Sequence, residues 1–208
     1  MRTPLSTRTP FEIADAFPEG TWYTDVNRFH RLAHFHLRRL KQLANQVIEN
    51  WPVPSSQSLK DSEISPKLGA LTDERDAASD ITRMFAAMAV EAFLNFYGAA
   101  RLGEDEYETH FERLGIIPKA KQLLLICDKT RIPEQDPLIQ ALKAVFNGRN
   151  DLVHPKAKKA SLDDPPLKHW RPIPGKAQDA VDAMDTFFRE FENLAPGAIH
   201  FTPALSRD

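Results

Sequence analysis

Cysteine is almost absent from this chain, because Cys127 is the one cysteine among 208 residues. A single cysteine excludes an intramolecular disulfide, so the fold does not depend on a covalent crosslink within the chain. Cys127 directly follows the apolar run at residues 123–126. We therefore predict a buried thiol that fills space as a small apolar side chain rather than a reactive group.

Long apolar runs are also missing. No run approaches the ~20 residues that a helix needs to cross a bilayer, and the first residues lack the apolar core of a secretory signal. We therefore expect a cytoplasmic protein without a membrane partner. The formal net charge of -2 offers no global attraction to nucleic acid, so any such surface has to be local. Glycine-rich phosphate loops, paired catalytic carboxylates and Cys/His zinc spacings are absent as well.

Apolar residues recur at steps of three and four along most of the chain, and no stretch alternates convincingly as a strand does. Proline and glycine mark the boundaries of these periodic segments. The pattern predicts an all-α bundle of about four main helices plus one or two short ones. The expected helices cover residues 24–50, 73–102, 104–114, a segment that begins at Pro118 and includes 123–126, a segment between Pro137 and Pro155, and residues 175–194.

The chain is long enough for a single domain with extensions. Residues 1–23 are aperiodic and are expected to form an irregular N-terminal arm. Residues 24–208 then form a single all-α domain, with its core at 73–194. Two connections are predicted in this domain, a long loop rich in Pro and Ser at 52–72 and a basic, then proline-rich loop at 155–174.

The segment at residues 149–154 combines three chemically active side chains, Arg149, Asn150 and His154. Arginine binds a phosphate through two parallel hydrogen bonds, and histidine transfers protons near neutral pH. Arg149 shares a helical face with apolar residues, so it needs a carboxylate, a cleft or a subunit interface. Asn150 and His154 are four residues apart and lie on one adjoining face. Gly148 suggests that another surface approaches the helix closely.

Two interpretations of this segment remain open on spacing alone. In the structural one, Arg149 pairs with an acidic residue and His154 caps the end of the helix. In the functional one, the arginine and the histidine act on a phosphodiester without a metal. The two side chains point ~140° apart on their helix, so one copy is poorly shaped to hold a single phosphate. The functional interpretation therefore predicts a dimer.

The Arg-Asn-x-x-x-His arrangement at residues 149–154 resembles the Arg-x4-His motif of HEPN domains, which also lies near the end of a core helix. Residues 88–95 resemble an upstream helix of HEPN-like proteins, with Glu91 and Asn95 among apolar residues. Met84 and Met88 share a helical face with these two polar residues. Glu91 is therefore expected to be buried and to pair with Arg149. The resemblance covers about residues 73–194.

The resemblance implies a homodimeric, metal-independent endoribonuclease, often a toxin or a phage-defence effector that an antitoxin or another regulatory protein controls. His154 is then the acid/base, Arg149 stabilises the charged phosphate, Asn150 orients the histidine and Glu91 anchors the arginine. Cofactors and metals are not expected. Some members carry a tyrosine two residues after the histidine that a partner enzyme modifies. Lys156 stands at that position, so modification of this kind is not expected here.

Basic residues surround the motif and also occupy the first helix. Lys156, Lys158 and Lys159 follow the histidine and can hold RNA phosphates, unless they form only a solvated loop. His30 and His34 have a spacing that can bind a metal. No acidic residue or second histidine pair completes a ligand set in the sequence, so we interpret them as part of a solvated basic face. That face is a second candidate for RNA contact.

A competing hypothesis is a non-catalytic helical module that binds RNA or a protein, with Arg149 and His154 in structural roles. It predicts an Arg149 that is sealed in the core against Glu91. The nuclease hypothesis instead predicts Arg149 and His154 at a cleft between two copies, with basic residues around it. The position of Arg149 in the fold therefore separates the two hypotheses.

Overall fold

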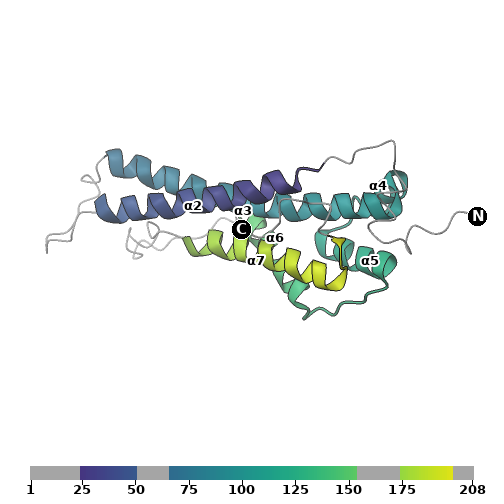
Figure 1. Ribbon diagram of the computed structural model, residues 1–208. Coiled ribbons are helices and arrows are strands. Elements are labelled where there is room, and N and C mark those ends of the chain that lie inside the picture. The colour runs from purple at the N-terminus through teal and green to yellow at the C-terminus, as the bar shows by residue number, and fades with distance from the viewer. Residues whose placement is uncertain (1–23, 51–65, 154–173, 199–208) are drawn as a thin grey trace, which may run out of the picture.

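The computed structural model describes residues 24–50, 66–153 and 174–198, and all of the regular elements in these ranges are helices (Figure 1). The predicted all-α class is confirmed. The expected N-terminal arm and most of the loop at 155–174 lie outside the described residues. The helices are α2 (Val26–Asn50), α3 (Pro66–Leu102), α4 (Glu104–His110), α5 (Ile116–Asp128), α6 (Pro137–Val153) and α7 (Pro174–Leu194).

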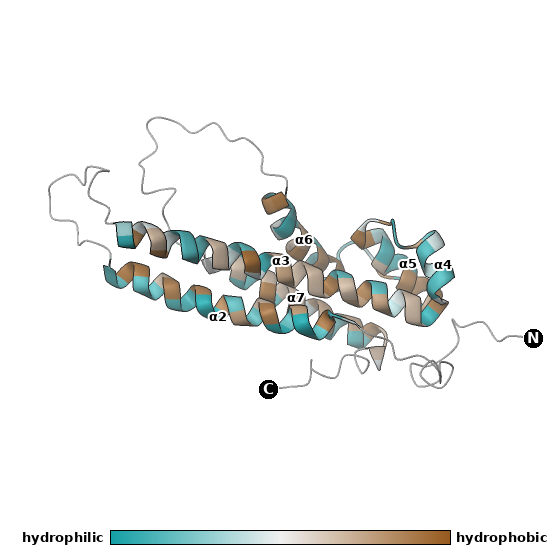
Figure 2. Cartoon of the chain, turned by 90° about the horizontal axis from the view of Figure 1, so that it is seen from above, coloured by the Kyte–Doolittle hydropathy of each residue, from teal (hydrophilic) through white to brown (hydrophobic). Residues whose placement is uncertain are grey.

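The two longest helices, α2 and α3, run antiparallel and side by side (Figures 1 and 2). From Ala33 to Val47 most buried residues of α2 are three or four apart, while Phe35 and Ile48 on its other faces are exposed. The ends of the pair near residues 50 and 66 extend beyond α6 and α7 in both views. No helix of the described ranges is both long and apolar enough to cross a membrane.

The start of α3 corrects the predicted loop at 52–72, because the helix begins at Pro66 rather than near residue 73. Proline suits the first position of a helix, where its missing N–H is not needed. Leu68 is buried, and the next buried positions at helical spacing include Thr72 and Arg75. Their polar side chains hide the apolar period that reveals a helix. The Thr72 hydroxyl donates to the Leu68 carbonyl at 2.9 Å, which satisfies it in the interior.

The short helix α4 ends at His110 rather than at Leu114 as predicted. The backbone N–H groups of Phe111 and Glu112 both donate to the Tyr107 carbonyl, at 2.8 and 3.1 Å. The second bond spans five residues, so the helix ends in a widened last turn. The next helix, α5, starts at Ile116, so that Pro118 lies in its first turn.

Aromatic rings from α3 and α7 form the centre of the core. Phe93 of α3 is fully buried and meets Phe188 and Phe191 of α7 edge to face, with ring centroids 5.4 and 4.9 Å apart. Tyr97 lies one turn further along α3 and contacts Phe191 in the same way, at 5.0 Å. This geometry is favourable for aromatic pairs beyond the area that they bury. The cluster fixes α7 against α3.

Helix α6 carries Arg149 and Asn150 in its last turn, and a capping residue fixes where it begins. Asp136 accepts a hydrogen bond from the Leu138 N–H at 2.9 Å, which is a standard N-terminal cap, and Pro137 takes the first position. Leu142 and Val145 are buried. The last turn of α6 lies beyond the edge of α3 (Figure 2). The fold thus anchors the first half of α6 and presents its C-terminal turn near the surface.

Gly98 of α3 is required by the close approach of α4. A Cβ at this position would lie 2.4 Å from Cδ2 and Cε2 of Tyr107, which is buried. We expect Gly98→Ala to lower the free energy of unfolding by about 1–3 kcal/mol, because the ring has no free space to enter. Gly69→Ala on the same helix is the matched control, since no atom lies within 4 Å of its added Cβ. The control is expected to be neutral or stabilising; equal urea midpoints for the two variants would contradict the prediction.

Candidate functional site

Arg149 and Asn150 lie at the C-terminal turn of α6, close to the surface. Arg149 is half-buried and Asn150 is exposed. Arg149 Nη1 donates to Asn150 Oδ1 at 3.2 Å, which holds the amide and the guanidinium side by side. His154 and the basic residues Lys156, Lys158 and Lys159 lie outside the described residues. The described half of the motif therefore presents an arginine and an amide to solvent.

Glu91 does not play the part that the sequence predicts for it. Its side chain is exposed, so the expected burial is wrong, and the ion pairs of the described ranges do not join it to Arg149. The charge of Glu91 instead acts on Lys119 and Tyr107. The reason is the orientation of α3, which turns the face with Met84 and Met88 to the half-exposed side of the bundle.

A second arginine, which the sequence did not single out, supports the end of α6. Arg83 of α3 has a side chain that is only 7% exposed, and its Nη2 donates to the Gly148 carbonyl at 2.5 Å. Its Nη1 lies 3.4 Å from Asp80 Oδ1, and its Nε has no hydrogen-bond partner among the described residues. A Cβ on Gly148 would lie 3.8 Å from Arg83 Nε, an ordinary contact. Arg83 therefore fixes the backbone next to Arg149.

Asn95 belongs to a buried polar cluster that joins α3, α4 and α5. Its Oδ1 accepts hydrogen bonds from the Tyr107 hydroxyl at 2.6 Å and from Lys119 Nζ at 2.8 Å. Burial lowers the pKa of Lys119, and the nearby carboxylates Glu91 and Glu112 oppose that shift. Each polar atom named here has a partner within the protein. The cluster is therefore interpreted as a structural crosslink between helices.

A second buried network closes the C-terminal end of α5. Arg101 Nη1 lies 2.9 Å from Asp128 Oδ1, and the Tyr97 hydroxyl donates to the other oxygen of Asp128 at 2.5 Å. Arg101 Nη2 also donates to the Cys127 carbonyl at 2.7 Å. The predicted burial of Cys127 is confirmed, and burial raises the pKa of its thiol to about 12, which disfavours the reactive thiolate.

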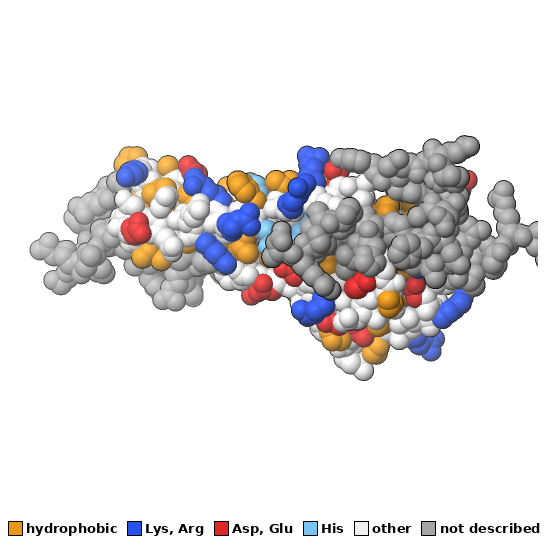
Figure 3. All heavy atoms as spheres, in the orientation of Figure 1, with side chains coloured by type: hydrophobic (Ala, Val, Ile, Leu, Met, Phe, Trp, Pro, Cys, Tyr) orange, Lys and Arg blue, Asp and Glu red, His pale blue; other side chains and the backbone are white. Residues whose placement is uncertain are grey.

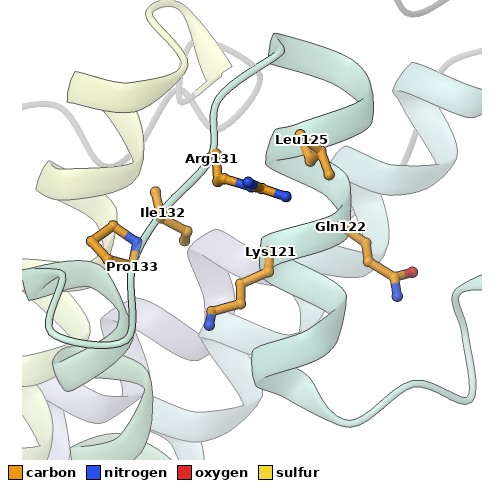
Figure 4. Close-up of a pocket in the computed structure, with 6 residues that line it drawn as sticks. All are labelled: Lys121, Gln122, Leu125, Arg131, Ile132 and Pro133. Carbon is orange, nitrogen blue, oxygen red and sulfur yellow. The ribbon is translucent and has the colours of Figure 1, made fainter.

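A pocket of about 430 Å³ lies between α5 and the connection that follows it, away from the end of α6. Figure 4 shows Arg131 extending from this connection toward the helix that carries Leu125, with Ile132 and Pro133 further along the connection. Lys121 also lines the pocket, but it forms an ion pair with Glu134. Arg149 does not line this pocket. The pocket therefore carries no argument for phosphodiester chemistry.

His30 and His34 are not part of a freely solvated face. Asp185 of α7 lies between them, with its Oδ1 at 3.1 Å from His30 Nε2 and 3.2 Å from His34 Nε2. The expectation that no acidic residue completes this pair is therefore wrong. Asp185 is more than 150 residues away in the chain, and no local spacing reveals it. Figure 3 shows histidine side chains at the middle of this face, with Lys and Arg along α2 beside them.

The carboxylate of this cluster is strongly acidic. Burial acts to raise the pKa of Asp185, but the hydrogen bonds from His30 and His34 outweigh burial and lower the pKa to about 2. The aspartate is therefore an anion at any ordinary pH. Two imidazole nitrogens and one carboxylate oxygen thus converge at a partly exposed position between α2 and α7.

The structure therefore contains two separate candidate sites, the Arg149–Asn150 turn and the His30–His34–Asp185 cluster. Of the predicted site residues that it describes, it joins Arg149 to Asn150 by a hydrogen bond and leaves Glu91 exposed, with no ion pair to Arg149 among the described residues. Comparison of the chain with models of protein families, with curated proteins and with solved structures gives no match.

Proposed function

We propose that this protein is a metal-independent endoribonuclease of HEPN type that works as a homodimer. Arg149 and Asn150 are the described part of its active site, and His154 follows them in the sequence. The proposal rests on the resemblance of residues 149–154 to the HEPN motif and on one structural observation. That observation is the position of Arg149, which is half-buried at the last turn of α6 and hydrogen-bonded to Asn150.

The position of Arg149 supports a role in phosphate binding. A guanidinium at a surface turn can form two parallel hydrogen bonds to a phosphodiester, whereas a guanidinium sealed in the core cannot. Arg83 holds the backbone of this turn through the Gly148 carbonyl and adds a second positive charge beneath it. A pair of Arg149 with a buried Glu91 would have favoured the competing hypothesis of a structural arginine, and Glu91 is exposed.

The chemistry requires one group to remove the 2′-OH proton and another to protonate the leaving 5′-oxygen. The 2′-oxygen attacks the adjacent phosphorus, the bond to the 5′-oxygen breaks, and the products are a 2′,3′-cyclic phosphate and a 5′-hydroxyl. Each chain contributes one motif histidine. A two-fold dimer contributes two histidines and two arginines, which is the full set for this reaction. RNA is therefore the proposed substrate and a second copy of the chain the proposed partner. An antitoxin or other regulatory protein is proposed from the resemblance alone.

Arg149→Ala is the direct test of this proposal. RNA cleavage in the presence of EDTA is expected to fall about 100- to 1,000-fold, the usual effect of losing one group that stabilises a developing charge. Arg189→Ala is the matched control, because Arg189 is also a surface arginine that bonds to its sequence neighbour, Glu190. The control should retain the activity of the wild type.

Two results would count against the proposal. The first is a wild-type protein that cleaves none of a broad set of single-stranded and structured RNAs. The second is an Arg149→Ala protein as active as the Arg189→Ala control. Sedimentation at the assay concentration tests the homodimer separately, and full activity in a strictly monomeric sample would contradict a shared active site.

A further inference from the structure

His30 and His34 supply two of the three side chains in a cluster that has the geometry of a metal site. They are four residues apart on α2, so their imidazoles lie on the same helical face, with ring centroids 4.6 Å apart. The side chains of His30 and His34 are 18% and 33% exposed. His30 also contacts Phe188 edge to face, with centroids 5.8 Å apart, so an apolar wall limits its movement.

Asp185 supplies the third ligand atom from a different helix. Its Oδ1 lies 3.1 and 3.2 Å from the two Nε2 atoms, and all three ligand atoms lie within 4.8 Å of one another. Metal–ligand bonds of ~2.0–2.1 Å in a tetrahedron separate neighbouring ligand atoms by ~3.3 Å. The observed oxygen–nitrogen distances are close to that separation. The arrangement of the three ligand atoms around Asp185 Oδ1 thus agrees with binding of one ion in place of the two hydrogen bonds.

We propose that His30, His34 and Asp185 bind a divalent transition-metal ion, with Zn²⁺ as the best match, which links α2 to α7. Two imidazole nitrogens and one carboxylate oxygen form a ligand set that suits Zn²⁺ and disfavours Mg²⁺ and Ca²⁺, which prefer oxygen ligands. Asp185 is 43% exposed, so water can occupy the fourth position. The bound ion carries one net positive charge after the aspartate is counted.

This site is separate from the proposed nuclease site. It shares no residue with the Arg149–Asn150 turn. Asp185 is also about 13 Å along α7 from Lys176, which approaches Asp151 of the motif-bearing turn at 3.8 Å. The proposed role of the ion is therefore a clamp between α2 and α7, which does not depend on the proposed function. A negative result in the metal-binding test would therefore leave the nuclease proposal standing, and a negative result in the RNA-cleavage test would leave the metal-site proposal standing.

The test uses the full chain, first freed of metal with a chelator that is then removed. We expect titration with Zn²⁺ to show saturable binding of one ion per chain and to raise the melting temperature, whereas Mg²⁺ at the same concentration changes neither. Asp185→Asn and His34→Asn should each weaken Zn²⁺ binding more than ~10-fold and abolish the thermal shift. Asparagine keeps an oxygen at the position of Asp185, so the hydrogen bonds that support the fold can remain.

His36→Asn and Asp182→Asn are the matched controls. His36 is on the same helix but stacks on Phe85, and Asp182 lies one turn before Asp185 and accepts a hydrogen bond from Gln178. Both controls should bind Zn²⁺ as the wild type does. The proposal is overturned if the wild type binds no Zn²⁺ up to millimolar concentration, or if both ligand variants bind it as tightly as the controls. Circular dichroism confirms that each variant is helical before its titration is interpreted.

Discussion

His154→Ala is expected to reduce RNA cleavage about 100- to 10,000-fold in the presence of EDTA. A side chain that transfers a proton in the transition state typically contributes a factor of this size. Histidine suits the task because its ordinary pKa lies near neutral pH, so it can both accept and donate a proton. The measurement is the rate of cleavage of a labelled RNA, together with the end groups of its products. A 2′,3′-cyclic phosphate and a 5′-hydroxyl are the expected ends for attack by the 2′-oxygen.

The control for this variant is His110→Ala. His110 is an exposed histidine at the end of α4, where it lies 3.9 Å from Glu106. Its removal should leave the rate unchanged. The catalytic role of His154 is refuted if the two alanine variants have equal rates. Products with a 5′-phosphate would instead indicate a water-dependent reaction and would also contradict the proposed chemistry.

Phe93→Ala is expected to lower the free energy of unfolding by about 3–5 kcal/mol, the usual effect of truncating a fully buried phenylalanine. Phe93 is inaccessible to solvent, and its ring meets three rings of α7 edge to face. The variant leaves a cavity at the contact between α3 and α7. The melting temperature should fall by roughly 6–20 °C for a chain of this size.

Phe35→Ala provides the comparison for the core variant. Phe35 is 54% exposed on α2, and its ring meets that of the neighbouring His36 at 5.2 Å. Its truncation should change the free energy of unfolding by less than about 1 kcal/mol. Thermal unfolding followed by circular dichroism measures both variants. Similar melting temperatures for the two would contradict the position of Phe93 at the centre of the core.

Several helix boundaries could be predicted from the sequence because local chemistry determines them. Pro137 marks the start of α6, and Gly103, with a φ of 94°, marks the end of α3. The start of α3 could not be predicted in the same way. Its buried face carries Thr72 and Arg75, so hydrophobic periodicity fails over those turns. Only contact with α2 makes that face an interior one.

The residues of the candidate sites differ in the same way: local sequence reveals some of them, and only helix packing reveals the others. Residues 149–154 were recognisable because their side chains are close together in the chain and follow one helical period. The supporting role of Arg83 and the ligand position of Asp185 were not recognisable, because each depends on the packing of two helices that are distant in sequence. For Glu91 the sequence predicted too much: its helical face contains Met84 and Met88 and was therefore assigned to the interior, but Glu91 is exposed.

The sequence by itself determined the helical class, most of the helix ranges and the position of the Arg-Asn-x-x-x-His segment at a helix end. These features follow from propensity, capping and periodicity, which act over a few residues. Only the tertiary structure decided which faces are buried, where Arg149 lies relative to Glu91, and which carboxylate meets His30 and His34. Those outcomes depend on how the described helices pack around one core, and a local pattern does not contain the angles and distances between helices.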